Sequence, residues 1–190
     1  NRLLVGTANG TIMTQSLIDS SEGTELQPDP TEVFEVSAIA TGTDGVIWAV
    51  TGCGLGFLPP GDGSGIPTNW AWYQFCSSSS DKATDILVNS GNVVISTGAN
   101  GVYVIDYNLS SNQSMVGIQS IDRWDTGNFL ASNRITDLQM MGSQLLISTE
   151  NAGISRRDMA TSTWLSRWST GNTLASKNIL GTSVSDGWLH

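Results

Sequence analysis

The sequence is poor in the residues on which most catalytic and metal sites depend. His190 is the only histidine, and a Ser-His-Asp or Cys-His arrangement would rest on this terminal residue, where chains are poorly ordered. Two cysteines without further histidines are too few for a zinc site. No loop carries the several carboxylates of a calcium-binding loop. We therefore expect no catalytic residue, no metal site and no cofactor.

Positive charge is also scarce. Lys and Arg number 8 against 17 Asp and Glu, which gives a net charge of −9. The cations are scattered along the sequence, so no basic stripe is present to neutralise phosphates, and we exclude nucleic acid as a main partner. An acidic surface keeps a protein soluble in a salty exterior. We accordingly predict an extracellular or cell-surface location.

Long apolar stretches are absent as well. No run approaches the roughly 20 residues that a helix needs to cross a bilayer, so we do not expect membrane insertion. The sequence begins without Met or a signal peptide and stops at "SDGWLH", where a new strand is predicted to begin. These two features indicate a piece of a longer protein.

The two cysteines, Cys53 and Cys76, can be read either as a disulfide or as two free thiols. A cysteine pair in a chain with few lysines is compatible with an oxidising compartment. If the two residues lie on first and third neighbours of one sheet, however, about twice the ~4.8 Å strand spacing separates them, beyond the ~7 Å limit for a disulfide. On that placement two unpaired thiols are expected, and a disulfide is the alternative.

What the sequence does contain is internal repetition. Four related segments occur, "RLLVGTANG" from residue 2, "VIWAVTGCG" from 46, "NVVISTGANG" from 92 and "QLLISTENAG" from 144. Two longer copies, "RWDTGNFLASNRI" (123–135) and "RWSTGNTLASKNI" (167–179), agree at nine of thirteen positions. Repetition with a period of roughly 45 residues is typical of stacked or radial repeat folds.

Turn signals divide each repeat into four strands. Each apolar segment follows a turn dipeptide of the kind that closes a hairpin, and a further candidate strand precedes each turn, at 33–41, 83–90, 134–141 and 178–184. The turn dipeptides are Asp44-Gly45, Gly91-Asn92, Gly142-Ser143 and Asp186-Gly187. A second turn leads to a more polar strand, and an aromatic strand ends the unit. Four antiparallel strands per repeat are the content of one β-propeller blade.

We therefore predict an all-β fold, a β-propeller of four-stranded antiparallel blades in one domain. The repeat units are 1–42, 43–89, 90–141 and 142–190, about four blades that belong to a larger propeller or close a ring by themselves. An unclosed ring leaves sheet edges free, and a homodimer could cover them.

The longest repeated motif is interpreted as the crossing from the outermost strand of one blade to the innermost strand of the next. Trp124 and Trp168 are predicted to fill the space between adjacent blades. Leu130 and Leu174 are predicted to anchor the connecting loop in the same space. The repetition thus reflects packing rather than function.

Residues 145–179, "LLISTENAGISRRDMATSTWLSRWSTGNTLASKNI", carry further recognisable motifs. They resemble the repeats of two-component regulator propellers and similar ligand-binding propellers, in which an Asp-x-x-Thr turn precedes a Leu-Ser-Ser-Asn-x-Ile motif. Asp158 and Thr161 match the turn, and the final motif is approximated by Leu174, Ser176, Asn178 and Ile179. The likeness is good over residues 92–190. It implies a sensory or binding propeller and carries over no catalytic residue.

Candidate binding residues are the polar positions that the copies do not repeat. In a propeller, the loops between blades and those between second and third strands open on one rim, where ligands commonly bind. The candidates on this rim are Arg134, Glu150, Asn151, Lys177, Asp81 and Lys82. The alternative for each is an ordinary solvated loop residue.

Two tryptophans give a second hypothesis. The segment "NWAWYQF" places Trp70 and Trp72 on one face of a strand, where an exposed aromatic pair could stack on sugars. Inter-blade packing is the alternative.

We predict a non-catalytic binding or sensing module of an extracellular or cell-surface protein, with a protein or carbohydrate ligand. Two alternatives remain, a polysaccharide-acting propeller enzyme and a purely structural surface segment. The enzyme would need two carboxylates in one cleft, such as Asp122 with Asp125 or Asp81 with Asp85.

Overall fold

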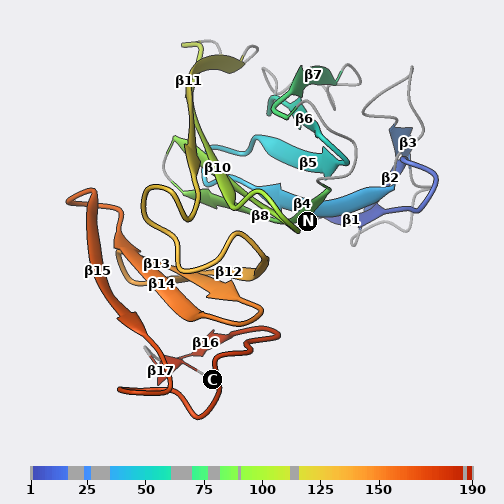
Figure 1. The fold of residues 1–190 in the computed structure, drawn as a ribbon. Helices are drawn as coiled ribbons and strands as arrows, with labels where there is room; N and C mark the ends of the chain where they lie inside the picture. The colour runs from blue at the N-terminus through green and yellow to red at the C-terminus, as the bar shows by residue number, and fades with distance from the viewer. Residues whose placement is uncertain are drawn as a thin grey trace.

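The structure is a computed structural model that describes residues 2–16, 24–26, 35–60, 70–76, 82–89, 91–111, 116–185 and 188–189. In this part of the chain every regular element is a β-strand (Figure 1). The described residues contain no helix that could span a membrane. The predicted all-β class is confirmed.

Three four-stranded antiparallel sheets follow one another along the chain. The first contains β4 (Val36–Thr41), β5 (Ile47–Thr51), β6 (Gly54–Leu58) and β7 (Ala71–Gln74). The second contains β8 (Ala83–Asn89), β9 (Asn92–Thr97), β10 (Val102–Leu109) and β11 (Val116–Trp124). The third contains β12 (Ile135–Met141), β13 (Gln144–Thr149), β14 (Gly153–Asp158) and β15 (Thr163–Trp168). Within each sheet the spatial order is the chain order, as in a propeller blade.

Shorter sheets flank these three. A three-stranded sheet of β1 (Arg2–Gly6), β2 (Ile12–Ser16) and β3 (Thr24–Leu26) precedes them, and β16 (Val184–Ser185) pairs with β17 (Trp188–Leu189) after them. The predicted repeat units that begin at residues 43, 90 and 142 each start at the second strand of a four-stranded sheet, β5, β9 or β13. In the described residues no strand pairing joins β1 to β16, and the covering of these edges by a second copy stays a prediction.

The sheets are arranged as successive wedges. Their innermost strands are neighbours in space, β1 beside β4, β4 beside β8, β8 beside β12 and β12 beside β16. Figure 1 shows the sheets following one another, with the β12–β15 sheet next to the β8–β11 sheet. This is the arrangement of propeller blades about a common axis, as the repeats predicted.

Second strands are apolar without alternation because both of their faces are covered. Val93, Val94 and Ile95 in β9 have no exposed surface, and Leu145 to Ile147 in β13 are equally buried. Neighbouring wedges cover such a strand from both sides, which is why its sequence is a continuous apolar run. Shared hydrophobic clusters therefore join the successive sheets from β1–β3 to β12–β15.

An aromatic contact illustrates the packing between the β4–β7 and β8–β11 sheets. The Trp48 ring is fully buried, with its centroid 4.7 Å from that of Tyr107 and 5.2 Å from that of Phe57. The Tyr107 hydroxyl donates a hydrogen bond of 2.8 Å to Asp44 Oδ2 in the β4–β5 turn. Burial and this carboxylate raise the pKa of the Tyr107 phenol. The contact links the two blades through apolar and polar groups together.

Two innermost strands each carry a carboxylate that accepts a hydrogen bond from the segment of the next wedge along the chain. Asp85 Oδ2 on β8 accepts a hydrogen bond of 3.1 Å from the backbone N–H of Leu138 on β12. Asp137 on β12 accepts one of 2.9 Å from the N–H of Thr182 in the following segment. The two carboxylates occupy equivalent positions after the same irregularity in strand pairing. A carboxylate therefore ties the β8–β11 blade to the β12–β15 blade, and another ties the β12–β15 blade to the segment that follows.

The two cysteines form a disulfide, with 5.1 Å between their Cα atoms. The expectation that they lie on first and third neighbours is wrong. Cys53 lies in the turn directly before β6, and Cys76 follows β7, which pairs with β6. The backbone N–H of Phe75 donates to Cys53 O at 3.1 Å, which fixes the two chain segments side by side.

The repeated motif forms the same loop twice. Asn128 Nδ2 donates to Arg123 O at 2.9 Å, and Asn172 Nδ2 donates to Arg167 O at the same distance. Gly101 and Gly153 have φ of 82° and 84°, and a side chain at either would overlap the carbonyl of Trp124 or Trp168. The predicted crossing between blades is therefore observed in both copies.

Burial of the two copies differs. Trp124 and Leu130 are 7% and 6% exposed and lie in the cluster shared by the β8–β11 and β12–β15 sheets. Trp168 and Leu174 are only half-buried. The predicted strand 178–184 is also wrong in extent, because only Val184 and Ser185 are in a strand. Residue 179 still donates its N–H to Thr149 O at 3.1 Å, which is the innermost position of the following wedge.

Candidate functional site

Four of the predicted rim residues lie together at the β13–β14 turn. Arg134 and Glu150 form an ion pair of 3.0 Å, and both side chains are largely exposed. Asn151 is exposed in the same turn. The carbonyl of Lys177 accepts a hydrogen bond of 2.9 Å from Gly153 N, which places this loop beside the turn.

Lys82 is the other predicted rim residue that the structure describes. Lys82 forms an exposed ion pair of 3.0 Å with Glu35 before the β8 strand. Asp81 lies outside the described residues. Lys82 and Arg134 thus have different carboxylate partners, Glu35 and Glu150.

Trp70 and Trp72 do not form an exposed ladder. Trp70 packs on the cluster of Ile12, Ala49 and Leu58 between the β1–β3 and β4–β7 sheets. Trp72 is half-buried, and its ring lies so close to Gly54 that a methyl group there would overlap it. Both tryptophans therefore serve packing in this structure.

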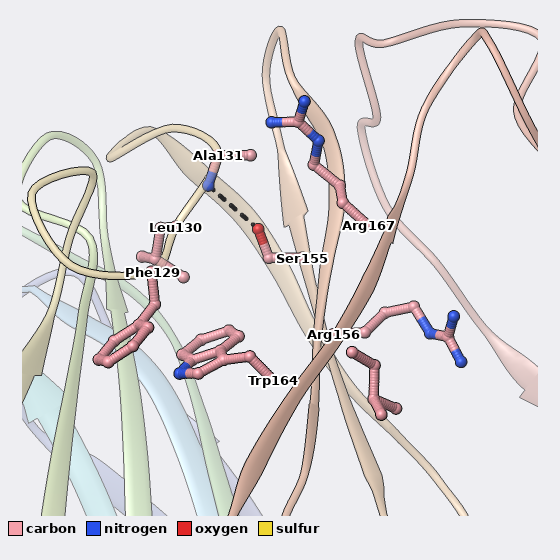
Figure 2. Close-up of a pocket in the computed structure, with 8 residues that line it drawn as sticks. Phe129, Leu130, Ala131, Ser155, Arg156, Trp164 and Arg167 are labelled. Atoms are coloured by element: carbon pink, nitrogen blue, oxygen red, sulfur yellow. Dashed lines mark hydrogen bonds between the residues drawn. The ribbon is translucent and has the colours of Figure 1, made fainter.

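A different cluster forms the groove that best fits a ligand. An open cavity of about 150 Å³ lies between the β11–β12 connection and the outer strands β14 and β15 (Figure 2). We call it the aromatic–arginine groove. It is lined by Phe129, Leu130, Ala131, Ser155, Arg156, Trp164, Leu165 and Arg167. Figure 2 shows the Phe129 and Trp164 rings at one end and Arg167 at the other, with Ser155 between them.

The aromatic end of the groove is built from three rings. Phe129 is 55% exposed and stacks on Trp164, with centroids 5.2 Å apart and an interplanar angle of 14°. Trp164 in turn meets the buried Trp124 edge to face at 5.2 Å. The inter-blade core therefore supports an exposed ring, which is a rigid apolar surface of the kind found at binding hot spots.

The sequence analysis missed Phe129 although a usable signal was present. Phe129 occupies the position of Thr173 in the second copy of the motif, so it is an unrepeated residue in a repeated loop. The rim candidates were the polar unrepeated positions only. Applied to apolar residues as well, the same rule would have found it.

The arginine end arises from a substitution in the third strand of the last complete blade. Strand pairing places Arg156 and Arg157 opposite Leu146 and Leu145 of β13. The equivalent positions hold Phe57 and Leu58 in β6, and Val104 and Ile105 in β10. Arginines thus replace a buried apolar pair, and Arg167 lies on the neighbouring strand β15. The eight cations are scattered along the sequence, yet three of them lie on these two paired strands.

Two of these arginines are held by the protein itself. Arg156 lies 4.2 Å above the Trp168 ring and donates to Gln144 Oε1 at 2.8 Å and to Ser166 O at 3.2 Å. Arg157 lies over the Trp124 and Trp164 rings at 4.6 and 5.2 Å. Partial burial lowers the pKa of both guanidinium groups, and each remains charged at neutral pH.

Arg167 differs from both. Its side chain is exposed, and within the described residues it has no carboxylate or ring partner. The groove therefore presents one guanidinium that is available to a ligand.

One carboxylate of each pair considered for a glycosidase has a partner within the protein. Asp125 is bound to Arg123 at 2.6 Å, and that ion pair lowers the pKa of the Asp125 carboxyl. Asp85 accepts backbone hydrogen bonds between blades, and its proposed partner Asp81 lies outside the described residues. Over the described ranges, no three His, Cys, Asp or Glu side chains are grouped as metal ligands.

A second cavity, of about 310 Å³, opens among the β8–β9, β12–β13 and β14–β15 turns. Its lining residues are Asn89, Asn92, Met140, Gly142, Ser143, Met159 and Ala160. They carry neither an aromatic ring nor a charged group, so the aromatic–arginine groove remains the better candidate.

The chain is similar to known proteins in fold and not in sequence. No protein-family model and no curated protein matches the chain. Among solved structures, the chain is similar to Sqt1 from Chaetomium thermophilum, with a TM-score of 0.67 and 13% identity over 96% of this chain and 46% of that one. The β-propeller domain of Cps50 (Swd1) from Myceliophteria thermophila has a TM-score of 0.66 and 10% identity over 98% and 56%. The computationally designed protein Ika8 has a TM-score of 0.64 and 14% identity over 100% and 51%.

The chain thus spans about half the length of each of these three structures. At such low identity the likeness shows the fold alone. It supports a propeller-repeat resemblance, and the narrower likeness to two-component regulator propellers stays a prediction. Together with the sheets described above, these similarities show that the chain has a β-propeller fold.

Proposed function

We propose that this chain is a non-catalytic protein-binding module that binds its partner through the aromatic–arginine groove. The propeller fold supports a binding or scaffold role, because propellers present fixed surfaces built on rigid blades. The resemblance of residues 92–190 to regulator propellers favours sensing as the purpose of that binding. We also propose an extracellular or cell-surface location, which the Cys53–Cys76 disulfide supports.

The exposed Phe129 ring carries the proposal. It is more than half exposed, yet the Trp164 ring holds it in one orientation. A large apolar side chain in that state loses little conformational freedom when a partner covers it. Aromatic residues and arginine together are also the residue types most enriched in binding hot spots.

A display experiment tests the proposal. A random peptide library is selected on the wild-type protein, and the enriched peptides are measured on Phe129→Thr. This variant installs the residue that the second copy of the loop already has, so the loop should fold unchanged. We expect peptides that bind the wild type and lose about tenfold or more of their affinity on the variant.

Rim variants provide the control. Arg134→Gln and Lys177→Gln remove charges at the β13–β14 turn and leave the groove intact. Peptides that bind Phe129→Thr normally but are lost on these variants would move the site to the rim. Selection that yields no specific peptide at all would overturn the protein-binding function.

A further inference from the structure

The aromatic–arginine groove has a charge opposite to that of the molecule. The chain carries a net charge of −9, yet the groove lining includes two arginines and no carboxylate. Arg157 adds a third guanidinium beside the groove, with Asp122 as its acidic neighbour. An acidic protein repels anions over most of its surface. A local positive site therefore directs an anionic partner to that one place on the surface.

The groove also has few polar groups besides its arginines. Ser155 Oγ already accepts a hydrogen bond of 3.1 Å from Ala131 N. Apart from the arginines and the Trp164 indole N–H, the other lining side chains are apolar. A sugar carries many hydroxyls that need donors and acceptors, and this surface supplies few. An apolar group joined to a single anion matches it better.

We propose that the groove takes an acidic peptide segment, in which an Asp or Glu lies close to an aromatic or aliphatic side chain. The inference rests on the proposed protein-binding function. The apolar side chain packs against Phe129, and the carboxylate accepts two parallel hydrogen bonds from the Arg167 guanidinium. Arg156 stays on Trp168 and contributes charge without leaving its protein partners.

Two matched peptide libraries test the chemistry. Both display random positions around a fixed phenylalanine. One fixes Glu at the flanking positions, and the other fixes Gln at the same positions. We expect the Glu library to be enriched on the wild-type protein well above the Gln library, and the binding of its members to weaken as salt rises.

Variants then locate the charge. Arg167→Gln should lower the affinity of the enriched Glu peptides by about tenfold or more. Arg167→Lys should retain only part of that affinity, because lysine cannot donate two parallel hydrogen bonds to one carboxylate. Arg134→Gln is the matched control, since it removes an arginine outside the groove. Thermal unfolding of each variant verifies that the exposed substitution leaves the fold intact.

The outcomes separate this inference from the function on which it rests. If both libraries are enriched equally and both lose binding on Phe129→Thr, the groove binds peptides without regard to charge, and the acidic ligand is wrong. If neither library is enriched, the protein-binding function itself falls. A sulfated oligosaccharide that binds in an Arg167-dependent manner while no Glu peptide does would assign the groove to a sugar instead.

Discussion

Phe129 and Thr173 occupy one position in two copies of the same loop, and their difference shows how single residues divide between architecture and function. The shared residues make turns, as Asn128 and Asn172 do by bonding the carbonyls of equivalent arginines. Phe129 adds an exposed ring that the loop does not need. A substitution at a shared position should therefore affect folding, and one at Phe129 should affect binding.

Asp85 provides a prediction at this scale. Burial, helped by the negative charge of Asp137, raises the pKa of the Asp85 carboxyl above its ordinary value, although two backbone N–H groups oppose the shift. The folded state therefore takes up this proton at a higher pH than the unfolded state. Wild-type protein should gain stability relative to Asp85→Asn as the pH falls from about 7 to below about 3.9, measured by urea unfolding across that range.

Asp125 serves as the control because its shift has the opposite sign. Arg123 lowers the pKa of its carboxyl, so the stability that this ion pair contributes is lost as the pH falls through the folded pKa. Wild type should lose stability relative to Asp125→Asn on acidification. Identical trends for the two substitutions would contradict this interpretation of Asp85.

At the scale of elements, strand order decides which sequence features meet. β14 and β15 pair so that Arg157 lies opposite Trp164, and this pairing creates the cation–aromatic contact behind the groove. The β6–β7 pairing similarly brings Cys76 back to Cys53. The outermost strand of the β4–β7 sheet is thereby held by a covalent bond as well as by backbone hydrogen bonds.

Reduction of the disulfide should destabilise this sheet. The bond closes a loop with a sequence separation of 23 residues, and removing a cross-link of that length raises the entropy of the unfolded chain. We expect the free energy of unfolding to fall by about 3 kcal/mol in reductant. A Cys53→Ser/Cys76→Ser variant should show the same loss in buffer and no further change in reductant. A wild-type protein equally stable in both conditions would contradict the expectation.

At the scale of the whole molecule, equivalent residues differ because their neighbouring wedges differ. Trp124 lies between two four-stranded sheets and is 7% exposed. Trp168 faces a wedge in which only β16 and β17 are paired within the described residues, and it is half-buried under Arg156. The packing contribution of one motif therefore depends on its place in the propeller.

Alanine substitutions should reveal this difference. Trp124→Ala should lower the free energy of unfolding by about 3–5 kcal/mol, because removal of a buried aromatic side chain leaves a cavity between two complete blades. Trp168→Ala should lower the free energy of unfolding by about 1–2 kcal/mol, because less of the apolar surface of this ring is buried. Urea unfolding of the two variants measures both values. Equal costs would show that the two copies are buried alike in solution.

The all-β class, the blade as the repeating unit and most strand positions could be predicted from the amino-acid pattern, because these depend on turn residues and apolar patterns within about 45 residues of chain. β8, β9, β12 and β13 lie within a residue or two of their predicted bounds. The inter-blade roles of Trp124 and Leu130 also followed from the repeated motif.

The disulfide, the extent of the last strand and the groove become evident only in the folded chain. Each of these three features depends on which strands become neighbours and on whether a further wedge covers a given face. The local pattern of apolar and polar residues predicts neither of these two things. Arg156, Arg157 and Arg167 are spread over two strands in the sequence and gather around Trp164 and Trp168 only when β14 pairs with β15. The groove arises at that contact because a buried ring supports an exposed one beside three of the eight cations of this acidic chain.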